Sequence, residues 1–89
     1  MKVIQMGMGG MGNAWIERLQ PLDFVEYVAF VETNPTIAEE SCIKHEITAP
    51  VFTTLSQAIE ATSAEAVIAV IPPEYRIETL KTCIEAGLP

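Results

Sequence analysis

Basic side chains are scarce in this chain of 89 residues. Five Lys and Arg stand against twelve Asp and Glu, which leaves a formal net charge of −7 at pH 7. A surface for DNA or RNA needs a stripe of cations that neutralises the phosphates. Five scattered cations cannot form such a stripe, so the composition argues against a nucleic acid as partner.

Cysteine and histidine are rare as well. Cys42 and Cys83 lie far apart without CxxC spacing, and His45 is the single histidine. These residues offer almost no material for a metal centre or a disulfide framework. We therefore expect no metal site and a reducing, cytoplasmic setting, with both cysteines packed as small core residues and His45 at a helix end.

Long hydrophobic runs are missing too. No stretch reaches the about 20 apolar residues that a membrane-spanning helix needs. Gln5 and the glycines after it interrupt the N-terminal segment, which therefore lacks the features of a signal peptide. Apolar residues still make up 49% of the 89-residue chain, and a chain of this size supports one small core. We expect a single small domain and no membrane partner.

The hydrophobic pattern predicts four strands, each followed by a helix. β-branched and aliphatic residues place the strands at Lys2–Met6, Val25–Val31, Pro50–Phe52 and Ala64–Ile71. Helical spacing and capping residues place the helices at about Met11–Leu19, Pro35–Lys44, Ser56–Ala61 with Ser56 as the cap, and about Tyr75–Ala86. Such alternation is typical of the α/β class, with a parallel sheet and right-handed crossovers.

A glycine-rich loop separates the first strand from the first helix. Gly7-Met8-Gly9-Gly10-Met11-Gly12 matches G-x-G-x-x-G in the strand–loop–helix context that this motif requires. The first glycine permits a tight turn, the second a close backbone approach to a pyrophosphate, and the third close packing of helix on sheet. The N–H groups from Gly10 to Gly12 are expected to hold the phosphates. Met8, at the loop tip, is expected to contact the cofactor, and Met11 to pack between helix and sheet.

Glu32 ends the second strand twenty residues after Gly12. A carboxylate at this place can accept hydrogen bonds from both hydroxyls of an adenosine ribose. It would repel a 2′-phosphate, and the adjacent Thr33 offers no positive charge to receive one. The sequence therefore predicts NAD as cofactor, with NADP less favoured. The competing interpretation is a plain strand-to-helix turn followed by a solvated acid.

These segments resemble the N-terminal dinucleotide-binding domain of the glucose-fructose oxidoreductase, inositol dehydrogenase and MocA family (Gfo/Idh/MocA). The likeness rests on the stretch from Val3 to Gly12, on Glu32, and on residues 65–73 with the helix tail 85–87. It implies a partial, Rossmann-like, doubly wound parallel sheet of about four strands in the order 3-2-1-4 with flanking helices. The fourth strand, at Ala66–Ile71, would then be an edge, and we expect the isolated chain either to self-associate through it or to rearrange.

The resemblance also implies a function. Family members transfer hydride between a nicotinamide and a sugar, polyol or related secondary alcohol, and Ile71 and Pro72 would line the cofactor. The familiar Thr-Pro-Asn and following histidine are replaced here by Ile71, Pro72, Pro73 and Arg76. This difference puts polar contacts from that loop, including any role for Arg76, in doubt.

The family's Glu-Lys-Pro motif and its second domain do not occur in residues 1–89. We therefore expect a partial dinucleotide-binding domain without catalytic residues, inactive alone, from a parent oxidoreductase that forms homo-oligomers. The alternative is a stand-alone nucleotide-binding or sensing module without chemistry.

Overall fold

The computed structural model describes residues 1–71 and 76–87. Its single sheet has four strands in the order β3-β2-β1-β4, with every neighbouring pair parallel. The strands are β1 (Lys2–Met6), β2 (Glu26–Val31), β3 (Val51–Phe52) and β4 (Ala66–Ala69). The predicted α/β class and strand order are therefore confirmed.

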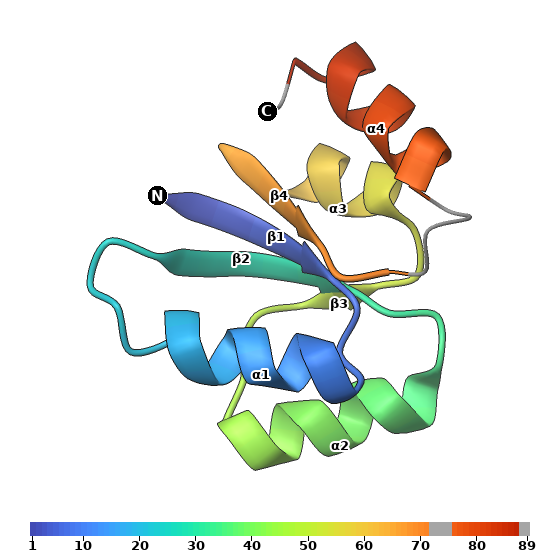
Figure 1. Cartoon of the computed structure of the whole chain (residues 1–89). Helices are drawn as coiled ribbons and strands as arrows, with labels where there is room; N and C mark the ends of the chain where they lie inside the picture. The colour runs from blue at the N-terminus through green and yellow to red at the C-terminus, as the bar shows by residue number, and fades with distance from the viewer. Residues whose placement is uncertain (72–75, 88–89) are drawn as a thin grey trace.

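Helices cover both faces of the sheet. They are α1 (Gly10–Leu19), α2 (Pro35–His45), α3 (Leu55–Ala61) and α4 (Arg76–Glu85). Figure 1 shows α1 and α2 below the sheet and α3 and α4 above it. Each strand thus leads to a helix on one side or the other, which is the doubly wound arrangement that the family resemblance implied.

The core consists of two clusters, one on each face of the sheet. Successive residues of a strand point to opposite faces, so β2 supplies both clusters. Ala29 and Val31 pack with Ile4 and the α3 residue Ala58, whereas Phe30 packs on the other face among the α1 and α2 residues. Ile4 and Ala29 are 0% exposed and Phe30 is 1% exposed. This two-sided burial explains why β2 is almost uniformly apolar.

Capping residues set the helix boundaries. Asn34 caps α2 by accepting hydrogen bonds from the N–H groups of Thr36 and Ile37 at 3.0 and 3.2 Å, as predicted. The prediction of Ser56 as cap of α3 is wrong. Thr54 caps that helix, and its hydroxyl accepts from the N–H of Gln57 at 3.3 Å. The Thr54 hydroxyl reaches the free N–H of Gln57 and so starts α3 at Leu55, two residues earlier than a cap at Ser56 would.

β4 differs from its prediction in length and burial. It ends at Ala69, and the N–H of Val70 adds one further bond to the carbonyl of Met6 at 2.8 Å. Among residues 1–71 and 76–87 it pairs only with β1, so it is an edge strand of the described sheet, as the strand order implied. Its first three residues are half-buried and Ala69 is exposed. The uniformly apolar sequence had indicated a buried strand, but only one side of β4 has a neighbour.

Candidate functional site

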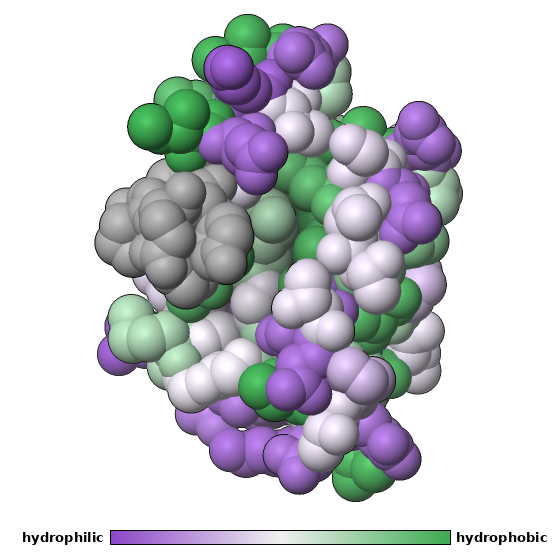
Figure 2. Space-filling view, turned by 90° about the vertical axis from the view of Figure 1, so that its right-hand side faces the viewer, coloured by the Kyte–Doolittle hydropathy of each residue, from purple (hydrophilic) through white to green (hydrophobic). Residues whose placement is uncertain are grey.

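A cleft of about 430 Å³ opens where the strands end. Parallel strands bring their carboxyl ends to one edge of the sheet, where α/β proteins bind ligands. The cleft is lined by Met6, Gly7, Gly9, Val31, Glu32, Thr33, Ile37, Thr53, Thr54, Leu55, Val70, Ile71, Glu78 and Thr79. Figure 2 views this edge of the molecule and shows hydrophobic residues in a hollow between paler and more polar ones.

Gly7 makes the turn from β1 into the loop. Its φ is 97°, a conformation that side-chain-bearing residues rarely adopt, and its N–H donates to the carbonyl of Val31 at 2.9 Å. A Cβ here would lie 2.1 Å from the carbonyl oxygen of Val70. Gly7 is therefore enclosed between β2 and the end of β4, so the tight turn expected of the first glycine is present.

The remaining glycines differ in their surroundings. A Cβ on Gly12 would lie 2.3 Å from the carbonyl oxygen of Gly7, so this position requires glycine for packing. A Cβ on Gly9 or Gly10 would meet nothing within 4 Å. Gly9 lines the cleft, so the space beside its backbone is open to a ligand.

α1 directs its N-terminus toward this open space. The helix begins at Gly10, and its N-cap Gly9 provides no side-chain hydrogen bond. The first N–H groups of a helix have no partner within the helix, and the helix dipole concentrates positive potential there. Gly10 and Met11, which follow the cleft residue Gly9, are exposed, whereas Gly12 is buried, so the donors that the sequence predicted for an anion are accessible at Gly10 and Met11.

Two methionine predictions need correction. The Met8 side chain is not at the loop tip. It is 0% exposed and packs with Ile16, Phe30 and Ala38, because the loop curls inward over the α1–α2 side of the core. Met11 is 69% exposed and does not pack on the sheet. Met8 therefore has no group placed to contact a ligand, since its N–H donates to Glu32, and at Met11 only the backbone N–H of the first helical turn could do so.

Glu32 is half-buried at the end of β2 and lines the cleft with Thr33. Its Oε1 accepts a hydrogen bond from the N–H of Met8 at 3.0 Å, and its Oε2 accepts one from the N–H of Asn34 at 3.1 Å. These two bonds fix the carboxylate beside the glycine loop. Each oxygen keeps lone pairs for further donors.

The other predicted residues divide into two groups. Ile71 lines the cleft beside Val70. Pro72, Pro73 and Tyr75 lie outside the described residues, as does the side chain of Arg76. Within residues 1–71 and 76–87, no helix is long and apolar enough to cross a membrane, and no group of three or more His, Cys, Asp or Glu gathers as metal ligands would.

Sequence reasoning missed the role of Gln5. This β1 side chain is 0% exposed, and its amide Nε2 donates to the carbonyls of Gly7 and Gly12 at 2.9 and 3.0 Å. Its Oε1 accepts from the hydroxyl of Tyr27 at 2.7 Å. A lone polar residue inside an apolar strand, just before a glycine loop, was the available signal.

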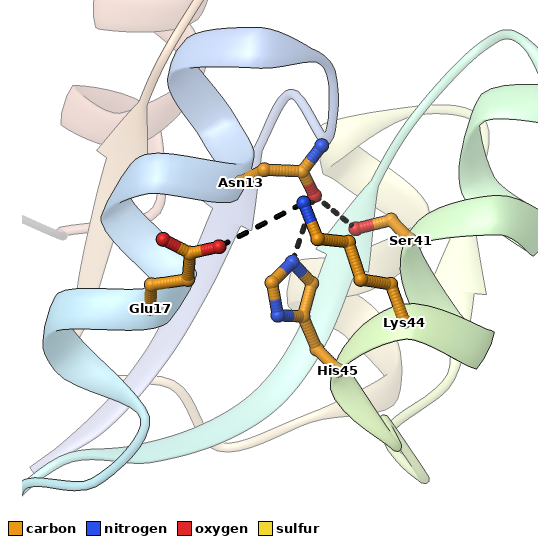
Figure 3. A network of polar contacts seen from close by, with 5 residues as sticks. All are labelled: Asn13, Glu17, Ser41, Lys44 and His45. Atoms are coloured by element: carbon orange, nitrogen blue, oxygen red, sulfur yellow. Dashed lines mark hydrogen bonds and ion pairs between the residues drawn. The ribbon is translucent and has the colours of Figure 1, made fainter.

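A second polar cluster joins α1 to α2 (Figure 3). The Oδ1 of Asn13 accepts from the hydroxyl of Ser41 at 2.7 Å and lies 3.0 Å from Nε2 of His45. Nζ of Lys44 and Oε1 of Glu17 lie 3.7 Å apart in an exposed ion pair that contributes little. His45 thus contacts the first turn of α1 as well as ending α2.

Comparison with solved structures gives close matches in fold. Scyllo-inositol dehydrogenase from Lactobacillus casei, bound to NAD(H) and scyllo-inositol, matches with a TM-score of 0.85 at 16% identity. Myo-inositol 2-dehydrogenase from Lactobacillus plantarum matches with a TM-score of 0.85 at 19% identity. Each match covers 98% of this chain and 26% of the other. GenD2 from gentamicin A biosynthesis, in complex with NAD, matches with a TM-score of 0.86 at 23% identity, over 99% of this chain and 25% of that one.

The chain has a Rossmann-like fold. Identities of 16–23% show the fold alone, and the chain spans about a quarter of the length of these three proteins. No family model matches the sequence, and neither does any curated protein. Function must therefore be argued from the cleft itself.

Proposed function

We propose that this chain is the dinucleotide-binding portion of a larger NAD-dependent oxidoreductase. One observation carries the proposal: the open space at Gly9 and the carboxylate of Glu32 lie in the same cleft at the carboxyl ends of the strands. A pyrophosphate and a ribose in one molecule need an anion site and a hydroxyl acceptor side by side. The NAD(H)-bound dehydrogenase from Lactobacillus casei, similar in fold, supports this assignment.

The phosphates would bind to backbone groups. The N–H groups at the start of α1 donate hydrogen bonds, and the helix dipole favours a negative charge there. The position of Gly9 leaves room for close approach because no Cβ intervenes. A chain with a net charge of −7 can hold a dinucleotide in this way without a cluster of basic side chains.

Glu32 would select NAD over NADP. Its two oxygens are held by the N–H groups of Met8 and Asn34, so the carboxylate is oriented before a ligand arrives. The adenosine ribose hydroxyls of NAD can donate to its free lone pairs. A 2′-phosphate would instead face a like charge, and the neighbouring cleft residue Thr33 carries no compensating cation.

The parent enzyme would act on a secondary alcohol of a sugar, polyol or related compound. When bound, the nicotinamide supplies the hydride acceptor or donor for such chemistry. The residues of this chain bind and orient it. The cleft, as described, is lined by Glu32 and Glu78 but by no Lys or His that could handle the proton, so we expect the 89 residues alone to bind NAD and turn over no alcohol.

Calorimetric titration of the purified protein with NAD and with NADP tests the proposal. We expect NAD to bind at least about tenfold more tightly, which corresponds to about 1.4 kcal/mol. Gly9→Ala should abolish most of this affinity because the new methyl group fills the phosphate space. Its free energy of unfolding should fall by less than about 1 kcal/mol, since the methyl group meets no protein atom.

Thr48→Ala is the matched control because Thr48 is exposed and lies outside the cleft. It should bind NAD like the wild type. Tighter binding of NADP would contradict the role of Glu32, and wild-type protein that binds neither dinucleotide would contradict the proposed function. Oxidation of an alcohol by these 89 residues would contradict the expectation that they bind NAD but lack the catalytic residues.

A further inference from the structure

Gln5 is a polar side chain in the most buried strand of the sheet. Its neighbours Val3 and Ile4 are 3% and 0% exposed, and Gln5 itself is 0% exposed. Burying an amide without partners costs a few kcal/mol, about 1–3 in proteins. The partners of this side chain therefore decide whether the burial is tolerable and what it achieves.

The orientation of the Gln5 amide follows from its surroundings. Nε2 faces two carbonyl oxygens, those of Gly7 at 2.9 Å and Gly12 at 3.0 Å. Oε1 faces the hydroxyl of Tyr27 at 2.7 Å. Exchanging the two ends of the amide would set an oxygen against two carbonyl oxygens, so both N–H groups must point at the loop.

These two bonds hold the loop at both of its ends. The carbonyl of Gly7 and the N–H of Met8 belong to one planar peptide unit, in which the two groups point in opposite directions. Gln5 binds the carbonyl side, and Oε1 of Glu32 binds the N–H side at 3.0 Å. This peptide plane is therefore fixed from two directions.

The peptide unit between Gly12 and Asn13 is held in the same way. Its carbonyl accepts from Gln5 at 3.0 Å, and its N–H donates to the carbonyl of Gly9 at 2.7 Å. A Cβ on Gly12 would also lie 3.3 Å from Nε2 of Gln5. The absence of a side chain at Gly12 thus lets the loop close over the buried amide, with the residues Gly9 to Gly12 between the two fixed planes.

We propose that Gln5 is a positioning residue that pre-organises the glycine loop for the dinucleotide phosphates, with Tyr27 holding Gln5 in place. The proposal rests on the proposed function. By binding the carbonyls of Gly7 and Gly12, Gln5 fixes the peptide planes on either side of the residues Gly9 to Met11, whose N–H groups would meet the phosphates. Donors arranged before binding need no reordering when the ligand arrives, which increases affinity.

Gln5→Met and Tyr27→Phe test this role. Methionine keeps the length of the side chain and removes both N–H donors, and phenylalanine removes only the hydroxyl that holds Oε1. We expect the affinity for NAD to fall about tenfold or more in Gln5→Met and about threefold in Tyr27→Phe. The affinity for adenosine, which carries the ribose but no phosphate, should stay within about twofold of the wild type in both. NAD is measured by calorimetry and adenosine by NMR shift titration.

The ligand pair separates positioning from a general effect on folding. Loss of NAD and adenosine affinity in equal measure would overturn the positioning role, because a partly unfolded protein weakens every ligand. NAD affinity unchanged in the folded variants would overturn it too. Tyr27→Phe removes a single oxygen, so it provides the test even if Gln5→Met does not fold. Wild-type protein that fails to bind NAD contradicts the proposed function itself. If the wild type binds NAD and the variants bind it equally well, only the role of Gln5 is contradicted.

Discussion

The first strand–helix unit, β1 with α1, and the last one, β4 with α4, differ in how far their side chains are buried and hydrogen-bonded within the protein. Around β1 and α1, Gln5 and Ile16 are 0% exposed, and the carbonyls of Gly7 and Gly12 accept hydrogen bonds from Gln5. On α4, Ile77, Leu80 and Ile84 are 75%, 60% and 66% exposed, and β4 beside it is a sheet edge. The unit that would hold the phosphates is thus supported from inside the protein, with the N–H groups at the start of α1 left for a ligand, whereas the α4 unit presents a row of apolar side chains to its surroundings.

The amino-acid composition does not distinguish buried apolar residues from exposed ones, although the structure separates them clearly. The apolar fraction of 49% includes core residues such as Phe30 and surface residues such as Ile77. Contiguous exposed apolar surface marks a place where another molecule or segment binds. The stabilisation that comes from burying apolar side chains is therefore concentrated around β1 and β2. Substitutions there should lower the free energy of unfolding more than substitutions on α4.

The largest change in the free energy of unfolding is expected for a substitution of Phe30. Its side chain is 1% exposed and stacks on Tyr27 with ring centroids 4.7 Å apart. Phe30→Ala should lower the free energy of unfolding by about 4 kcal/mol, since it removes a large buried ring and leaves a cavity. Urea denaturation followed by circular dichroism measures this value. A loss below about 1 kcal/mol would mean that the β2 core is not the main source of stability.

Gly7→Ala should follow, with a loss of about 3 kcal/mol in the free energy of unfolding. The positive φ of 97° is strained for alanine, and the methyl group would lie 2.1 Å from the carbonyl of Val70. Gly10→Ala is the matched control at the start of α1, where a methyl group meets nothing within 4 Å. It should be neutral or stabilise by up to about 1 kcal/mol. Equal losses in the two variants would contradict the enclosed turn at Gly7.

Tyr27 should make the stability depend on alkaline pH. Burial raises the pKa of its hydroxyl from 10.0 to about 12 in the folded protein. The stabilisation is complete below the unfolded pKa near 10.0 and is lost as the pH rises toward about 12, because only the unfolded chain ionises readily in that window. Urea denaturation at several pH values should show this loss in the wild type and a smaller one in Tyr27→Phe. Identical profiles would indicate that Tyr27 is solvated.

The smallest change is expected on α4. Leu80→Ser should alter the free energy of unfolding by no more than about 0.5 kcal/mol, because Leu80 is 60% exposed. The same substitution should reduce self-association of the protein through the β4 edge and the exposed face of α4. Light scattering at high concentration compares the two proteins. A wild type that remains monomeric would contradict self-association through this side.

Much of the fold was predictable because it depends on local patterns. The alternation of strands and helices predicted the parallel sheet, and the family resemblance implied the strand order that the structure has. The glycine motif with its acid led to the cleft, where Gly7, Gly9, Glu32 and Thr33 come together with Ile71, which the resemblance had implied. These features follow from turn geometry and from the parallel sheet, which bring the strand ends to one edge.

The wrong and missed predictions concern residues whose surroundings are determined by tertiary packing. Met8 is buried and Met11 exposed because of the path that the loop takes over the core, and glycine spacing does not specify that path. Gln5 binds Gly7, Gly12 and Tyr27, residues up to 22 positions away along the chain. No periodicity relates such partners. The internal support of the loop therefore became visible only in the folded structure.

An NMR titration with NAD tests the central claim most directly. The backbone amide signals of the protein are followed as the dinucleotide is added. The account predicts that the largest shifts occur at Gly9, Gly10 and Met11 and next to Glu32, while Ile84, on the exposed part of α4 away from the cleft, changes little. Shifts confined to α4, or no shifts at the glycine loop, would contradict a dinucleotide site at the start of α1.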